Sequence, residues 1–141
     1  MKTIEEKISK NLDVTPDKAW EVIGAIGGVD RWFSSLIKTC SVANGKRFCQ
    51  TIDGTDLVED ILEVNHETKT FRFAIPQQTM LPVEDIVETM TVRNDGNGKS
   101  IVDWSASFKA TPENGEIAKE AFKNLWNTGL QEMETYINQN L

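Results

Sequence analysis

Residues 115–141 read GEIAKEAFKNLWNTGLQEMETYINQNL, and this stretch decides how the rest of the chain is interpreted. Its apolar residues recur every three or four positions, with lysine, glutamate, asparagine and glutamine between them, which is the period of an amphipathic helix. A helix of about 25 residues is about 37 Å long, more than one strand can cover. The sequence therefore predicts a long C-terminal helix buried inside a curved sheet, with plain packing of helix on sheet as the alternative.

The residues before this helix mostly follow the period of β-strands. Strands are expected at residues 3–12, 37–42, 47–52, 57–64, 70–75, 83–93 and 99–109. The pair Asn44-Gly45 between the second and third strands is a strong signal for a tight hairpin. Thr15-Pro16-Asp17 combines an N-cap, a proline and an acid, so a short helix is expected to begin there, followed by a second short helix or turn at residues 29–36. Meandering antiparallel strands with helices at two places predict an α+β fold in one domain, residues 1–141.

Composition argues against several classes of function. A net charge of −7 and a pI of about 4.7, with scattered basic residues, argue against binding of nucleic acid. One histidine, two cysteines and the lack of Cys-x-x-Cys or P-loop motifs predict no metal site and no cofactor. The apolar runs are too short to span a membrane, and residues 1–7 do not resemble a signal peptide, so a cytoplasmic location is expected. The sequence does not indicate the oligomeric state.

A set of landmarks lies along nearly the whole chain: Thr15-Pro16 with Ala19-Trp20, Arg31-Trp32, Leu81-Pro82, Asp103-Trp104-Ser105 with Phe108, and Gly129-Leu130. Together with the order of elements, they resemble the START-like (SRPBCC) superfamily, which includes the birch-pollen-allergen-like proteins. The most similar branch looks like the polyketide cyclase/dehydrase-like proteins. This resemblance implies a helix-grip fold, in which a seven-stranded antiparallel sheet wraps around the last helix, two short helices follow the first strand, and a cavity lies between sheet and helix.

A second similarity concerns residues 37–42 and 58–61, which look like strands of the plant abscisic-acid receptors of the same superfamily. Those strands carry a pocket lysine and a pocket glutamate. The gate and latch motifs of the receptors are missing here, so hormone sensing with a phosphatase partner is not implied. Carried over by position, the similarity implies a cavity lined by Lys38, Glu59, Phe73, Ile75, Ile86, Glu88, Leu125 and Gly129.

Strand periodicity places two carboxylates on otherwise apolar faces. Glu59 shares a face with Leu57 and Ile61, and Glu88 shares one with Ile86 and Met90. A carboxylate sealed in such a face without a partner raises its pKa or destabilises the fold. These positions therefore favour a wet cavity, a cationic partner such as Lys38, or a ligand hydroxyl, unless the faces are partly exposed to solvent. Aromatic residues of the helix add candidates that also fit an ordinary core. With them, the candidate ligand-binding residues are Lys38, Glu59, Ile61, Phe73, Ile75, Ile86, Glu88, Phe122, Leu125, Trp126 and Gly129.

Two functions fit this set of residues. The first is a binding protein that takes a hydrophobic or amphipathic small molecule into a cavity between the sheet and the C-terminal helix. The second is a polyketide cyclase/dehydratase-like enzyme that uses Glu59, Glu88 or Lys38 for proton transfer. No catalytic residue is assigned, and binding is preferred because no histidine, activated serine or metal site supports catalysis. An interaction domain with a filled core is the third possibility.

The hairpin also predicts how the two cysteines are placed. A two-residue turn at Asn44-Gly45 pairs Cys40 with Cys49 across the two strands. Cα atoms at a non-hydrogen-bonded antiparallel pair lie about 4.5 Å apart, at the short end of the range for a disulfide. Two adjacent free thiols that couple only under oxidation are therefore expected.

Overall fold

One antiparallel sheet of seven strands, in the order β1-β7-β6-β5-β4-β3-β2, forms most of the structure. The computed structural model describes residues 1–141. The first strand pairs with the last strand along its whole length, from Lys2 opposite Ala110 to Leu12 opposite Ser100. The elements are β1 (Lys2–Leu12), α1 (Pro16–Ile23), α2 (Val29–Trp32), β2 (Ile37–Ala43), β3 (Lys46–Thr51), β4 (Asp56–Asn65), β5 (Thr70–Ile75), β6 (Glu84–Asn94), β7 (Ser100–Ala110) and α3 (Pro112–Asn140).

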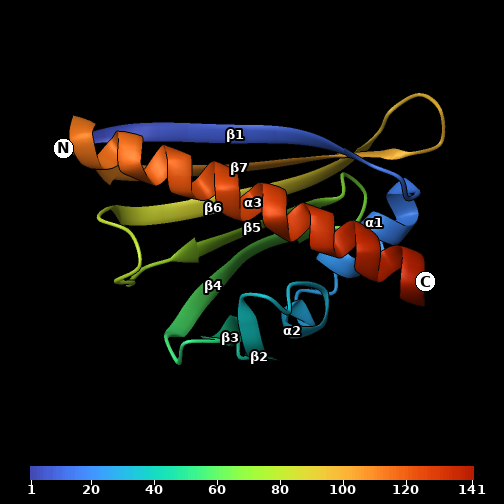
Figure 1. Cartoon of the computed structure of the whole chain (residues 1–141), viewed down its shortest axis with the longest axis horizontal. Helices are drawn as coiled ribbons and strands as arrows, with labels where there is room; N and C mark the ends of the chain where they lie inside the picture. Colours follow the sequence, from blue (N-terminus) through green and yellow to red (C-terminus); the bar gives the residue numbers. More distant parts are fainter.

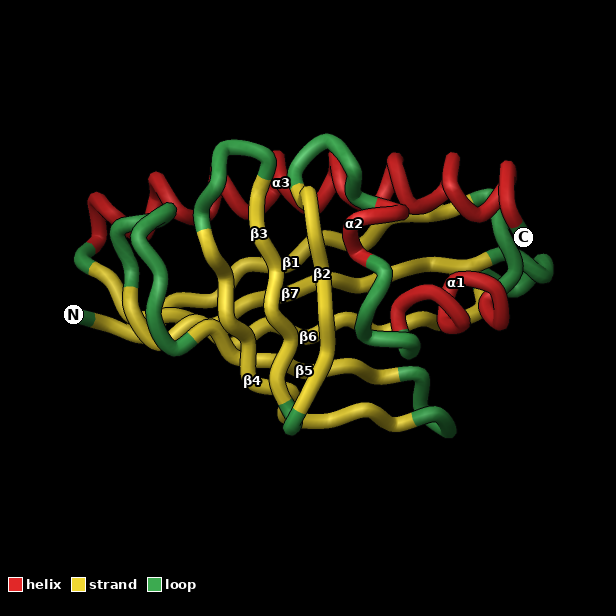
Figure 2. The backbone as a smooth tube through the Cα atoms, turned by 90° about the horizontal axis from the view of Figure 1, so that it is seen from below, coloured by secondary structure: helices red, strands yellow, loops and turns green.

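The sheet is strongly twisted and holds the long helix on its inner side. In Figure 1, α3 runs obliquely across the sheet, and α1 and α2 lie near its C-terminal half. In Figure 2, β2 and β3 run across the direction of β1 and β7, so this end of the sheet curves round in front of the other strands. The predicted helix-grip α+β fold, with a seven-stranded sheet around the C-terminal helix, is confirmed.

Helix α3 begins three residues earlier than the sequence pattern predicts. Thr111 is the N-cap, and its side chain accepts a hydrogen bond from the backbone N–H of Asn114 at 3.3 Å. Pro112 and Glu113 complete the same signature that starts α1 at Thr15. Gly115 therefore lies in the first turn, where a Cβ atom would come within 2.3 Å of the Ile4 side chain.

No helix in the structure is both long enough and apolar enough to cross a membrane.

The β2–β3 hairpin has the predicted turn and register. Asn44 and Gly45 both have positive φ angles, 54° and 74°, as a type I′ turn requires. Cys40 lies opposite Cys49, and both cysteines are free. A β-bulge interrupts the pairing between Ile37 and Thr39.

The core contains a column of aromatic rings that connects β7 with α3. Phe108 lies 5.4 Å from Phe122, which stacks on Trp126 at 5.0 Å, and Trp126 stacks on Trp104 at 5.7 Å between ring centroids. The side chain of Trp126 is fully buried. Because this column crosses the space between sheet and helix, it fills one part of the interior and leaves a cavity beside it.

A cavity with a buried carboxyl and a buried ion pair

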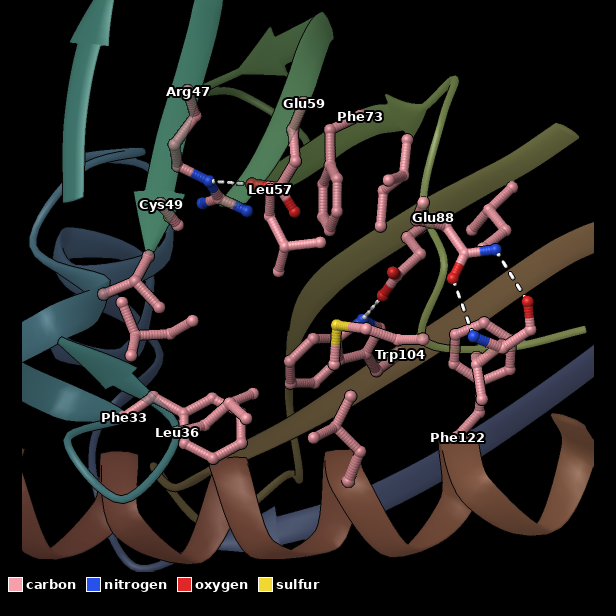
Figure 3. A pocket seen from close by; sticks show the side chains of 18 of the residues that line it. Phe33, Leu36, Arg47, Cys49, Leu57, Glu59, Phe73, Glu88, Trp104 and Phe122 are labelled. Carbon is pink, nitrogen blue, oxygen red and sulfur yellow. Dashed lines mark hydrogen bonds and ion pairs between the residues drawn. The ribbon is translucent and has the colours of Figure 1, made fainter. Parts of the chain in front are cut away.

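The cavity lies between α3, the inner side of β3–β7 and the segment from α2 to the start of β2. Its volume is about 220 Å³, and 17 of its 21 lining residues are hydrophobic. Three ionisable side chains, Arg47, Glu59 and Glu88, are exceptions to this apolar lining. Figure 3 shows the Arg47–Glu59 pair on one wall, with the Glu88 carboxyl and Trp104 on another.

Glu88 is held in place by two tryptophans. It extends from β6 with the buried residues Ile86 and Met90 on the same face of the strand. Its Oε1 accepts hydrogen bonds from the indole N–H of Trp104 at 2.7 Å and of Trp126 at 3.1 Å. Its Oε2 makes no hydrogen bond with the protein. The carboxyl is therefore fixed in orientation, and Oε2 is the oxygen left for a further partner: it accepts when the carboxyl is ionised and carries the proton when it is neutral.

The surroundings of Glu88 favour its neutral form. Burial and the nearby charge of Glu59 raise the pKa of Glu88 from the ordinary 4.5 to about 7, although the two indole N–H groups and the charge of Arg47 oppose the rise. Desolvation penalises the charged form of a buried acid, and a like charge adds to the penalty. Glu88 therefore titrates near neutral pH.

This raised pKa predicts a specific pH dependence of stability. Below pH 4.5 the carboxyl is protonated in both the folded and the unfolded chain, so it contributes no penalty. Between pH 4.5 and about 7 the unfolded chain loses the proton and the folded chain keeps it, so stability falls as pH rises. The difference corresponds to roughly 3 kcal/mol at ~1.4 kcal/mol per pH unit.

The variant Glu88→Gln keeps an oxygen for the two indoles and does not titrate. We expect urea unfolding to show similar stability for wild type and variant near pH 4.5, and a variant more stable by roughly 3 kcal/mol at pH 8. Comparing the two proteins cancels the titration of other carboxyl groups. A constant difference across this range would contradict the assigned protonation of Glu88.

Arg47 and Glu59 form a buried ion pair between neighbouring strands β3 and β4. Their side chains are each 8% exposed, and Arg47 Nε donates to Glu59 Oε1 at 2.5 Å. Arg47 also donates through Nη1 to the carbonyl of Ile26 at 2.8 Å, and its guanidinium lies 4.8 Å from the centroid of the Phe73 ring. Burial opposes the charge of Arg47, but Glu59 raises the pKa of the guanidinium above its ordinary value.

Most of the residues that the sequence predicts for the site lie on the cavity wall. Seven do so: Glu59, Phe73, Ile75, Ile86, Glu88, Phe122 and Leu125. Trp126 lies behind the wall, where it donates a hydrogen bond to Glu88 and stacks on the lining residues Trp104 and Phe122. Ile61 is partly buried against the hydrophobic core and does not line the cavity. The structure places both predicted glutamates, Glu59 and Glu88, on the cavity wall. The predicted cation, Lys38, is not there.

The placement of Lys38 in the cavity is wrong. Lys38 is exposed, while its neighbour Ile37 is buried and lines the cavity. The bulge between Ile37 and Thr39 lies on the outermost strand of the sheet, where the side chain of Lys38 turns to solvent. Arg47 supplies the positive charge instead.

Gly129, which the similarity also places on the cavity wall, does not line the cavity. A Cβ atom at this position would lie 2.8 Å from Cε2 of Phe33. The glycine therefore admits the Phe33 ring, which itself lines the cavity. Its effect on the site is indirect.

Sequence reasoning missed Arg47 because the alternation in β3 is misleading. Phe48 and Ile52 suggest an apolar inner face, yet they are 40% and 58% exposed, while Arg47, Cys49 and Thr51 are buried. The register of β3 with β4 could have identified Arg47. A buried acid at Glu59 needs a partner, and Arg47 lies directly opposite Glu59 in the pairing of β3 with β4.

Comparison with known proteins agrees with this fold. The family described as Polyketide cyclase / dehydrase and lipid transport matches residues 3–138, so the chain belongs to this family. No curated protein sequence matches it. The relatives described next share less than a quarter of their residues with this chain, so their likeness concerns the fold.

An uncharacterised protein from Bacillus thuringiensis is 18% identical, with a TM-score of 0.85 over 95% of this chain and 98% of its own. Norcoclaurine synthase from Thalictrum flavum, solved with dopamine and hydroxybenzaldehyde, is 12% identical, with a TM-score of 0.80 over 99% of this chain and 89% of its own. Major latex-like protein 151 from Panax ginseng is 16% identical, with a TM-score of 0.75 over 95% and 97% of the two chains. The three structures share the helix-grip arrangement with this chain.

Proposed function

We propose that the protein binds a small, flat and mainly apolar molecule that carries a hydrogen-bond donor. The size of the cavity supports a ligand of one or two rings. A cavity of roughly 150 Å³ accommodates benzene, and pockets for drug-sized ligands begin at about 300 Å³. At about 220 Å³ the cavity lies between these values, so a long acyl chain with its headgroup does not fit.

The observation that carries this proposal is the free Oε2 of Glu88 in an apolar wall. Oε2 faces the cavity without a partner in the protein, and a ligand hydroxyl or amine can donate a hydrogen bond to it when the carboxyl is ionised. The charges of Arg47 and Glu59 balance each other, so the cavity is neutral or negative depending on Glu88. An anionic ligand would enter without a free positive charge, which disfavours it. The dopamine and hydroxybenzaldehyde held by the norcoclaurine synthase structure are flat aromatic molecules of this general size.

A matched pair of probes tests the proposed contact. 2-Naphthol has a flat apolar body and one hydroxyl donor, and 2-methylnaphthalene has the same body without the donor. In Glu88→Gln the amide oxygen still faces the two indole N–H groups, so the amide NH₂ faces the cavity and cannot accept a hydrogen bond. At pH 8 we expect the variant to bind 2-naphthol about 10- to 100-fold more weakly, because a hydrogen bond to a charged group is worth about 1.5–3 kcal/mol.

Equilibrium dialysis of both probes with both proteins provides the measurement. Binding of 2-methylnaphthalene should change by less than about threefold, because the apolar contacts remain. Equal losses for the two probes would indicate a general change in the cavity and contradict a hydrogen bond at Oε2. Failure of both probes to bind the folded wild type would favour an interaction domain with a filled core.

A second candidate function, a cyclase or dehydratase, is supported by one observation. A carboxyl with a pKa of about 7 on a cavity wall can accept and return a proton near neutral pH. The ketone 2-tetralone, which has two fused rings, distinguishes the candidates. Deuterium exchange at its α-carbon that is accelerated by wild type and not by Glu88→Gln would favour the enzyme. Binding without such acceleration would favour the binding protein.

A further inference from the structure

The β2–β3 hairpin carries a pair of thiols. Neither the proposed ligand binding nor the Arg47–Glu59 ion pair gives these thiols a role. Cys40 and Cys49 are register partners in an antiparallel pair, and both are free. Cα atoms of such partners are about 4.5–5.5 Å apart, and a disulfide spans about 4.4–6.8 Å. The Cα separation typical of such a pair therefore falls within the range that a disulfide bridges.

The two thiols lie in different surroundings. Cys40 is half-buried on the outermost strand and reachable from solvent, whereas Cys49 is buried and lines the cavity. A hydrogen bond from the Cys49 thiol lowers the pKa of Cys40 to about 6. The Val29 backbone and the charge of Arg47 also lower this pKa, whereas burial and the charge of Asp30 raise it. The same hydrogen bond, burial and the charge of Glu59 raise the pKa of Cys49. Cys40 is thus the accessible and more acidic thiol, and Cys49 is the buried and less acidic one.

We propose that Cys40 and Cys49 form a peroxide-reactive thiol pair, in which Cys40 attacks a hydroperoxide and Cys49 resolves the product as a disulfide. The assignment of roles follows the positions of the two residues: the accessible sulfur meets the reagent, and the buried sulfur lies beside it across the hairpin. The thiolate is the nucleophilic form of cysteine, and a neighbouring thiol captures the resulting sulfenic acid as a disulfide. The proposal does not depend on the identity of the cavity's ligand.

The reaction balances with one hydroperoxide. The Cys40 thiolate attacks the outer oxygen of ROOH, so a sulfur–oxygen bond forms, the oxygen–oxygen bond breaks, and RO⁻ leaves and takes a proton to become ROH. The sulfur of Cys49 then attacks the sulfenic sulfur of Cys40 as it gives up its proton. Hydroxide leaves and combines with that proton as water. The two thiols are oxidised by two electrons, and the hydroperoxide is reduced to ROH and water.

Hydrogen peroxide, intact mass and a thiol count test this proposal on the full chain. Wild type should lose both titratable thiols and two hydrogens within one chain, and a thiol reductant should restore them. Cys49→Ser should stop at a sulfenic acid on Cys40 that dimedone traps. Cys40→Ser is the matched control, and its remaining Cys49 should react at least about tenfold more slowly than Cys40 does in Cys49→Ser, because Cys49 is protonated and buried.

Three results would overturn the proposal. The first is that both thiols persist in folded wild type while peroxide oxidises free cysteine in the same solution. The second is a disulfide that links two chains. The third is equal reactivity of the remaining cysteine in the two variants. A thermal unfolding curve shows whether Cys49→Ser folds. If it does not fold, the test rests on the rate of thiol loss in wild type compared with that in Cys40→Ser.

Discussion

The substitution Arg47→Met is expected to lower the free energy of unfolding by about 3–5 kcal/mol, because removal of one partner leaves a buried charge uncompensated. Glu59 is the group left behind, and its side chain is 8% exposed. The substitution also removes the hydrogen bond to the carbonyl of Ile26 and the guanidinium beside the Phe73 ring. Urea unfolding near neutral pH measures the loss.

The double variant Arg47→Met/Glu59→Leu is the control for this interpretation. Replacing both members of a buried ion pair by apolar residues is often neutral or stabilising, by about 1–4 kcal/mol. The double variant should therefore recover most of the stability lost in Arg47→Met. A double variant as unstable as the single one would show that the pair is not buried as described, or that the arginine acts mainly through its packing.

The substitution Trp126→Ala is expected to cost about 3–5 kcal/mol, as truncation of a buried tryptophan in a core usually does. Trp126 has no exposed surface and stacks between Phe122 and Trp104. It also donates one of the two hydrogen bonds that Glu88 accepts. Thermal and urea unfolding of the variant give the free energy lost.

The matched variant Trp126→Phe separates packing from hydrogen bonding. It keeps an aromatic ring in the column but removes the indole N–H, so the loss of stability should be clearly smaller than for alanine. Because that N–H lowers the pKa of Glu88, the variant should raise this pKa further. A variant in which the Glu88 titration does not move, followed by carboxyl carbon chemical shifts, would contradict the role of Trp126 in holding the carboxyl.

The fold follows from the sequence because its local signals agree with one another. The period of the last helix, the Asn44-Gly45 turn and the alternation around Phe73 and Glu88 each have a local physical cause, and the structure contains all of them. The sequence pattern places the helix start at Gly115, which resembles a turn residue, although the capping signature begins at Thr111. Its actual use is close contact with Ile4, which is a tertiary effect.

On the strands, the site follows from the sequence where the alternation of apolar residues matches the buried face. Ile86 and Glu88 on β6 have pairing strands on both sides, so the alternation of buried and exposed residues is regular there. β2 is an edge strand with a bulge, and β3, although paired on both sides, buries Arg47 while it exposes Phe48. The pattern along these strands therefore misplaces Lys38 and does not reveal Arg47. The pairing of Arg47 with Glu59 needs the register between strands, which a single strand's pattern does not contain.

The most direct test of a ligand in the cavity is an NMR titration of the tryptophan indole N–H signals with 2-naphthol, with signals assigned from single Trp→Phe variants. Trp104 lines the cavity and donates to Glu88, whereas Trp20 donates to His66 at 3.0 Å and does not line the cavity. A saturable shift of the Trp104 signal with an unmoved Trp20 signal is the predicted result. An unmoved Trp104 signal, or unsaturable shifts of both signals alike, would contradict binding in this cavity.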